Sequence, residues 1–312
     1  MIRFGAGTLG DAPGLLAGRG FGGYVLLTTP RAESPVLADG AQAVLHVPSG
    51  PVPDAAAAVR SGVEGRPLVA LGGGRVVDAA KAIGGADGLP VAAVPTTLSG
   101  AEMTPFHRMP AGVDTFKLVR PALVICDPAL MASQPMPGLA ASAMNALAHA
   151  VEALYTPLAN PVAEMAALRA AALIAEGLYP DEPERVALAL GALLAGYAVG
   201  LTALAVHHAV CQTIVRVCGT PHAQTNAVML PHFVRFMEPR SPREIALLRE
   251  ALGGDVEPLS ARAGVTTLGE LGVTEDDLPR IMESVAQRGD IAANTPGAPS
   301  ADDLREVIAA AI

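Results

Sequence analysis

The sequence predicts an α/β domain with a doubly wound parallel sheet (Rossmann-like), followed by an all-α domain. Short apolar runs alternate with helical patterns through residues 1–133, which is typical of βαβ units. Residues 134–312 contain no convincing strand pattern, only Ala- and Leu-rich helical runs separated by Pro and Gly. Three consecutive glycines follow one apolar run, as in a turn from a strand into a helix. We therefore expect two domains, 1–133 and 134–312.

The first domain contains five β-rich runs, and two helical patterns lie between the second and the fourth of them. Each run is apolar throughout, as expected for strands that are buried on both faces of a parallel sheet. The predicted strands are 23–29, 42–47, 67–74, 89–95 and 122–128, and the predicted crossover helices are 53–65 and 75–85. Ligands of such sheets bind at the carboxyl ends of the strands.

The second domain is divided by helix-breaking residues. The breaks lie near Pro157, Pro180, Gly219–Pro221, Pro239 and Gly253–Gly254. The apolar run 186–210 is long enough to suggest a membrane span. Its small residues and its His-His end instead favour a tightly packed bundle helix.

Composition limits the classes of protein. The 312 residues are 51% hydrophobic and 16% charged, which argues against disorder, and the net charge of −9 argues against nucleic-acid binding. Three cysteines (Cys126, Cys211 and Cys218) show no framework spacing, so we expect reduced thiols. The N-terminal segment has no apolar signal region. We expect a cytoplasmic protein that binds a small molecule and neither nucleic acid nor membrane.

Two successive strands end in loops suited to phosphate. Gly72, Gly73 and Gly74 carry no side chain that would block an anion from the backbone N–H groups of the following helix. Hydroxyl groups follow the next predicted strand, at Thr96, Thr97 and Ser99. A tight turn or a helix N-cap would explain either loop alone. Two such loops at one sheet edge favour a nucleotide site.

Histidines gather in the second domain. Asn145 and His149 lie one turn apart on one helical face, and three further histidines follow at 207, 208 and 222. A lone histidine in an apolar helix is usually a core residue. Four of them in two apolar segments more readily line a cavity, where imidazole can bind a metal or move a proton.

Five ordered motifs resemble the iron-containing alcohol dehydrogenase superfamily, and most of all its maleylacetate reductases. They are GGGRVVDAAKA (72–82), PTTLSGAEMTP (95–105), MNALAHAVEALY (144–155), VHHAVCQ (206–212) and PHAQTNAVMLPH (221–232). The resemblance implies the dehydroquinate synthase-like fold of that superfamily, with a dinucleotide-binding domain, a helical substrate domain and an active site in the cleft between them. It also implies NAD(P)H as cofactor, a small-molecule substrate and a homodimer.

The resemblance assigns roles to individual residues. Gly72, Gly73 and Gly74 would hold the pyrophosphate of NAD(P)H, and Thr96, Thr97 and Ser99 would contact the phosphates and the nicotinamide side. Asp78 would lie near the cofactor. Metal-dependent members bind iron or zinc with one Asp and three His, and these positions are Asn145, His149, His208 and His222 here.

Asn at the first ligand position is shared with maleylacetate reductases, which resemble this chain and require no metal. We therefore expect a metal-independent reductase of a small keto or enol acid, with Asn145, His149, His208 and His222 as catalytic residues. Iron or zinc on the three histidines is the less favoured alternative, because an amide replaces a charged ligand.

Three departures leave other functions open. Arg75 follows the glycines where the family usually has Ser, and Gln212 replaces a His one turn after His208. The segment 106–124, which contains Lys117, is shortened, so this lysine need not contact the cofactor. A non-redox lyase or cyclase on the same scaffold is the main alternative, and a non-catalytic relative is another.

Overall fold

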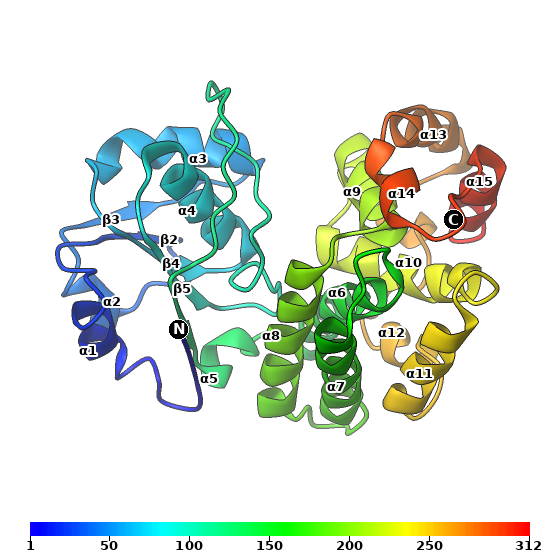
Figure 1. The fold of residues 1–312 in the computed structure, drawn as a ribbon, viewed down its shortest axis with the longest axis horizontal. Coiled ribbons are helices and arrows are strands. Elements are labelled where there is room, and N and C mark those ends of the chain that lie inside the picture. The colour runs from blue at the N-terminus through cyan, green and yellow to red at the C-terminus, as the bar shows by residue number, and fades with distance from the viewer. The chain divides into compact units, whose positions relative to one another are not determined.

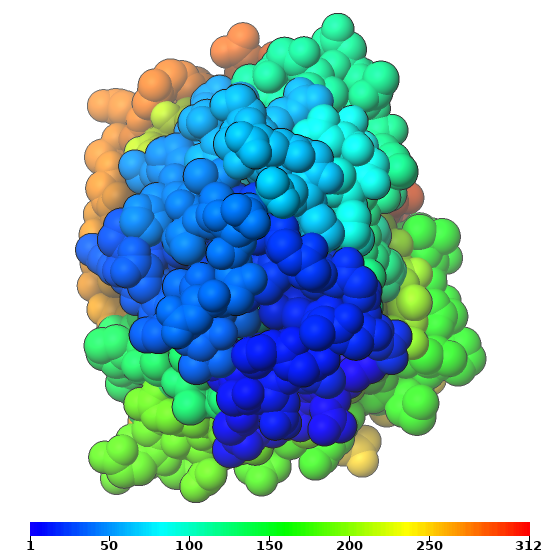
Figure 2. Space-filling model, turned by 90° about the vertical axis from the view of Figure 1, so that its left-hand side faces the viewer, coloured from blue at the N-terminus to red at the C-terminus, as the bar shows by residue number.

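The computed structural model describes residues 1–312 and divides into two compact units, Met1–Ser133 and Gln134–Ile312 (Figure 1). The first unit contains all of the strands, and the second consists of helices. Figure 2 shows the surface of the first unit, coloured from dark blue at the N-terminus toward cyan.

The first unit is built on a six-stranded parallel sheet with the order β1-β6-β5-β4-β2-β3. The strands are β1 (Ile2–Phe4), β2 (Val25–Thr28), β3 (Ala43–His46), β4 (Leu68–Gly72), β5 (Val91–Pro95) and β6 (Leu123–Cys126). All five predicted strands are present, and the α/β fold class is confirmed. The edge strand β1 was not predicted, since it is short and largely exposed.

Helices cover both faces of this sheet. They are α1 (Ala12–Ala17), α2 (Pro35–Ala38), α3 (Val52–Arg60), α4 (Gly74–Asp87) and α5 (Pro128–Met131). Successive side chains of β2 alternate between two apolar clusters, with Val25 and Leu27 in one and Leu26 in the other. This alternation explains why the strands read as continuous apolar runs.

The second unit contains no strand. Its helices are α6 (Met136–Tyr155), α7 (Pro161–Leu178), α8 (Arg185–Leu201), α9 (Val206–Cys218), α10 (His222–Met237), α11 (Pro242–Leu252), α12 (Glu257–Ala261), α13 (Leu278–Ala286), α14 (Gly289–Asn294) and α15 (Ala301–Ala309). The predicted all-α character of residues 134–312 is therefore confirmed.

The sequence predicts a single bundle helix over the apolar run 186–210. The structure instead divides this run between two helices. Helices α8 and α9 meet at an angle of 103° across a short break. Thr202 and Ala205, at the two ends of the break, leave the helical region of backbone conformation. No single helix meets the length and hydropathy needed to cross a bilayer, and α8 and α9 meet them only as this bent pair. The bend separates the start of α9, with its two histidines, from α8.

Helices α7 and α8 approach each other closely at two glycines. A Cβ atom on Gly177 would lie 2.5 Å from Cγ of Leu188, and one on Gly191 would lie 2.9 Å from Cγ1 of Ile174. Helix α6 packs against both helices of this pair. Because Gly177 and Gly191 have no side chains, α7 and α8 can pack closely and form the surface against which α6 packs.

Candidate functional site

In the first unit, the glycine turn packs directly against the hydroxyl-bearing loop. A Cβ atom on Gly73 would lie 3.1 Å from Cγ2 of Thr97, and one on Gly74 would lie 3.1 Å from Cβ of Ser99. The backbone N–H of Thr96 donates to the carbonyl of Gly72 at 3.0 Å. The two loops meet because β4 and β5 are adjacent and end in register. The convergence expected from the sequence is present.

The amino end of α4 opens at this turn without a side-chain cap. Its first N–H groups are therefore available to an anion, and the helix dipole favours negative charge there. Arg75 lies exposed in the first turn and makes no ion pair. A cation at this end is unfavourable for an isolated helix, but it suits a bound phosphate.

Asp78, on the same helix, already has a partner. Its carboxylate lies 2.7 Å from Nζ of Lys81, which is fully buried. Lys81 also donates to the carbonyls of Ala101 at 2.8 Å and Phe106 at 2.7 Å. The pair therefore ties α4, which begins at the glycine turn, to the loop that follows Thr96–Ser99.

Glu102 in that loop is a buried acid without a partner. Its side chain is 1% exposed, and neither carboxyl oxygen has a hydrogen-bond partner. Burial raises the pKa of Glu102 to about 7. No sequence pattern singles out this residue.

Lys117 lies away from the glycine turn. Its carbonyl oxygen would be 2.8 Å from a Cβ atom on Gly85, near the carboxyl end of α4, whereas Gly74 begins that helix. With Gly84 and Val91 it lines a pocket of about 420 Å³ at the opposite end of α4. The shortened segment thus leaves Lys117 remote from the two converging loops.

In the second unit, three helices bring the predicted polar residues together. Helix α6 carries Asn145 and His149, α9 carries His208, and His222 opens α10. The rings of His149 and His208 stack with centroids 4.4 Å apart and planes 14° apart. Burial lowers the pKa values of both, and His222 lies close enough to lower them further when it is charged.

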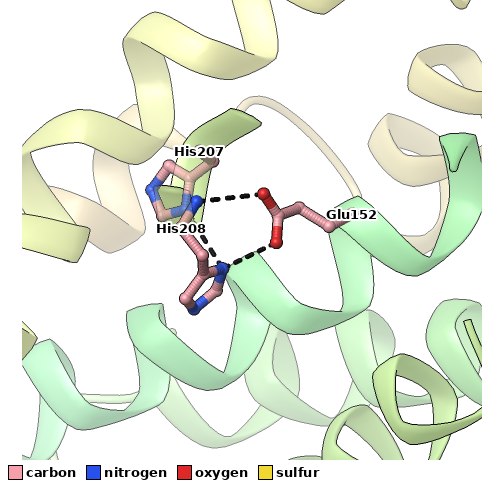
Figure 3. Close-up of side chains that lie close together, drawn as sticks. All are labelled: Glu152, His207 and His208. Carbon is pink, nitrogen blue, oxygen red and sulfur yellow. Dashed lines mark hydrogen bonds and ion pairs between the residues drawn. The ribbon is translucent and has the colours of Figure 1, made fainter. Parts of the chain in front are cut away.

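His208 is held by Glu152, one turn after His149 on α6 (Figure 3). Nδ1 of His208 lies 2.7 Å from Oε2 of Glu152, and its backbone N–H donates to Oε1 at 3.0 Å. Helix α9 has no side-chain cap of its own, so Glu152 also caps its first turn from another helix. Sequence reasoning missed this contact, and a lone carboxylate on an apolar helix face was the available signal.

Several buried polar atoms of the cluster have no partner in the protein. They are Oδ1 of Asn145, Nδ1 of His149 and Nε2 of His208. An unpaired buried polar atom costs about 1–3 kcal/mol, so a set of three is expected where a ligand completes the hydrogen bonds. Since Nδ1 of His208 donates to Glu152, its Nε2 presents a lone pair.

Burial sets the charge state of the cluster. It lowers the pKa of His149 well below its usual value and that of His208 to about 3. Burial raises the pKa of Glu152 to about 7, although backbone N–H groups at the start of α9 work against this shift. The stacked imidazoles are therefore neutral at pH 7 and can accept or donate hydrogen bonds or bind a metal.

One group of side chains brings its ligand atoms close enough together to hold a metal. Glu152, His207 and His208 each offer a ligand atom within 4.8 Å of the others, a group that the sequence did not predict. Nε2 of His207, however, bonds to the carbonyl of Asn226 at 3.3 Å, and both oxygens of Glu152 have donors. The set of Asn145, His149, His208 and His222 is not such a group, and Nε2 of His222 lies 3.3 Å from Nδ2 of Asn226. It does leave Nδ1 of His149 and Nε2 of His208 without partners, and imidazoles suit iron and zinc.

Residues 139–312 match the profile of the Fe-containing alcohol dehydrogenase family, C-terminal. Maleylacetate reductase 1 of Rhodococcus opacus is 36% identical over 257 residues, which cover 77% of this chain and 72% of that protein. Maleylacetate reductase of Sphingobium indicum is 34% identical over 305 residues, which cover 89% of this chain and 86% of that protein.

Solved structures agree over the whole chain. Maleylacetate reductase from Agrobacterium tumefaciens has a TM-score of 0.85 and 29% identity, covering 100% of this chain and 95% of that one. Iron-containing alcohol dehydrogenase from Corynebacterium glutamicum has a TM-score of 0.88 and 25% identity, covering 100% of this chain and 94% of that one.

Proposed function

This chain belongs to the Fe-containing alcohol dehydrogenase family, whose members are NAD(P)-dependent oxidoreductases, and from that premise we propose that it reduces a small keto or enol acid. A hydride passes from C4 of the nicotinamide to an unsaturated or keto carbon, and a proton completes the reduction. The similarity to maleylacetate reductases supports a carboxylated substrate. The observation that carries the proposal is the set of unpartnered atoms on Asn145, His149 and His208.

The nucleotide belongs to the first unit in this proposal. Gly72, Gly73 and Gly74 allow the pyrophosphate to approach the open amino end of α4, and Thr96, Thr97 and Ser99 supply hydroxyl groups beside it. Arg75 adds a positive charge at the same end. Asp78 keeps this loop in place through Lys81 rather than by touching the cofactor.

The substrate belongs to the second unit. His208 commits its Nδ1 to Glu152, so it can accept a hydrogen bond at Nε2 but cannot give a proton there while neutral. For this reason we assign the proton to a relay through His149 or His222, in which a neutral ring passes its N–H proton to the substrate while its other nitrogen takes up a proton from solvent. Asn145 orients the substrate with its amide. The neutral imidazoles bind a substrate oxygen, and because they carry no charge they do not repel the positive charge that develops on the nicotinamide ring.

We propose that the reaction requires no metal, because the amide of Asn145 supplies no charge to hold an ion. The side chains of this cluster nevertheless offer nitrogen and oxygen atoms, which are ligand types that divalent iron and zinc accept. If iron or zinc were bound, His149, His208 and His222 with Asn145 would hold it, and the ion would polarise a substrate oxygen.

The test is a titration of purified protein of known metal content with NADH and with NADPH, followed by nicotinamide fluorescence. Oxidation of the bound nucleotide is then measured with maleylacetate and related keto dicarboxylates, before and after treatment with a chelator. We expect binding, turnover and no loss of rate on chelation. Failure of both nucleotides to bind at millimolar concentration would refute the reductase, and loss of rate that returns with added metal would refute metal independence.

A further inference from the structure

Gln212 lies one turn after His208 on α9, so the two side chains share a helix face. Its carboxamide oxygen accepts a hydrogen bond from Arg288 at 3.3 Å. Arg288 comes from the segment just before α14, which packs against α9. These two helices lie side by side at the upper right of Figure 1. A residue far away in the sequence therefore contacts the turn that follows His208.

Arg288 cannot turn freely, because most of its donors are in use. Its Nε and one terminal nitrogen bond to Asp290 at 2.8 and 2.6 Å, and the other terminal nitrogen donates to the carbonyl of Ala209 at 3.4 Å. Asn294 ties the same segment to the residues just before α9, through the carbonyl of Leu204 at 2.9 Å. The guanidinium is thus a fixed donor whose charge is already balanced.

This arrangement determines which way the Gln212 amide points. A guanidinium has only donors, so the amide oxygen must face Arg288 and the NH2 group must face away. The NH2 group has no partner in the protein, and the residue is partly exposed. Gln212 consequently presents a fixed hydrogen-bond donor on the face of α9 that carries His208.

We propose that Gln212 determines specificity by donating its amide N–H to a carboxylate oxygen of the substrate, and that Arg288 is the residue that positions it. One helical turn spans about 5.4 Å, so the contact falls on a group neighbouring the oxygen held at His208. An amide donor does not titrate, so this contact depends on the ionisation of the substrate carboxylate and not on that of a protein side chain. The inference rests on the proposed function, since it names the part of the keto acid that the helical unit recognises.

The first test is Gln212→Glu, which keeps the size of the side chain but replaces the donor with an acceptor. We expect KM for maleylacetate to rise about ten- to hundredfold, the loss typical of a hydrogen bond to a charged group, with kcat within about threefold. Affinity for NADH or NADPH should not change. Unchanged KM in an enzyme that still binds nucleotide would overturn the proposal.

The second test separates positioning from general stability. Arg288→Met should raise KM in the same direction as Gln212→Met, and the double variant should be no worse than Gln212→Met alone. Arg280→Met is the matched control, because Arg280 also pairs with a nearby acid, Asp277, but its hydrogen bond goes to that acid and not to Gln212. Additive effects of the two substitutions, or an equal rise in KM for Arg280→Met, would show that Arg288 acts on stability alone.

Binding of an unreactive dicarboxylate distinguishes this inference from the proposed function. Calorimetry with adipate measures the carboxylate contact without hydride transfer. Weaker adipate binding to Gln212→Glu than to the wild-type protein supports the contact, even if no reductase activity is found and the proposed reaction fails. Equal adipate binding to both proteins, in an active reductase, refutes the contact alone.

Discussion

The carboxylate of Glu152 accepts hydrogen bonds from both the backbone N–H and Nδ1 of His208, at 3.0 and 2.7 Å, although 56 residues separate them. One side chain therefore caps α9, fixes the tautomer of the imidazole and aims its Nε2 lone pair away from the contact. The orientation of His208 is decided by a helix to which it does not belong.

We expect Glu152→Gln to lower kcat/KM about ten- to hundredfold, as when other partners that orient a functional imidazole are removed. The amide offers only one acceptor oxygen, so one of the two donors of His208 loses its partner. Stability should fall by about 1–3 kcal/mol, measured by urea unfolding. Nitrogen chemical shifts of labelled histidine would report the tautomer, and an unchanged Nδ1–H tautomer with unchanged kinetics would contradict the assignment.

Asn145→Asp should convert the cluster into a metal site. The substitution adds a buried negative charge at the first ligand position, beside imidazoles with unused lone pairs. We expect stoichiometric zinc or iron after dialysis, measured by elemental analysis, and a Tm that falls when a chelator is added. Asn145→Ala, which adds no charge, should retain as little metal as the wild-type protein. Stoichiometric metal in the wild-type protein would contradict the proposed metal independence.

Gly73→Ala should weaken nucleotide binding while leaving the fold intact. The added methyl group would lie 3.1 Å from Thr97 and push apart the two loops that converge there. We expect the Kd for NADH or NADPH to rise at least about tenfold, a change of about 1.4 kcal/mol. Gly14→Ala is the control, since a Cβ atom there meets nothing within 4 Å. Equal Kd values for the two variants would argue against a nucleotide at this turn.

Glu102 should make the protein less stable in mild alkali than in mild acid. The pKa of its carboxyl is raised from 4.5 in an ordinary environment to about 7, so between these values the folded state holds a proton that the unfolded chain has released. The contribution of Glu102 to the free energy of unfolding falls as pH rises from 4.5 through 7. The fall is up to about 3 kcal/mol, at 1.36 kcal/mol per pKa unit.

Urea unfolding at pH 5 and pH 8 measures the effect. Glu102→Gln should remove most of the difference in unfolding free energy between the two pH values and should raise stability at pH 8. The buried Glu152, whose pKa shift has the same sign, leaves a residual dependence. A variant with the same pH dependence as the wild-type protein would show that Glu102 is solvated or paired.

The fold was predictable because its strands and helices differ in hydrophobic pattern over their whole lengths. The exceptions have local causes. Strand β1 is short and exposed at the sheet edge, so its sequence shows little hydrophobic pattern. The break between α8 and α9 contains no Pro or Gly from which it could be predicted. Both features depend on packing with distant residues rather than on local propensity.

The candidate site was predictable only as far as the spacing along one helix and the adjacency of successive strands determine it. Helical spacing places Asn145 and His149 on one face, and adjacent strands bring Gly73 to Thr97. Spacing does not reveal which helices face each other. The contacts of Glu152 with His208 and of Arg288 with Gln212 join distant parts of the chain, and they follow from tertiary packing alone.

Gly177 and Gly191 contact no functional residue, yet they allow α7 and α8 to pack closely against each other and against α6. A methyl group at either position would separate the two helices and displace the helix that carries Asn145, His149 and Glu152. Such a variant would be expected to fold and still lose activity, with no altered residue near the chemistry. The sensitivity of this enzyme to substitution therefore extends to Gly177 and Gly191, where a hydrogen atom stands in place of a side chain.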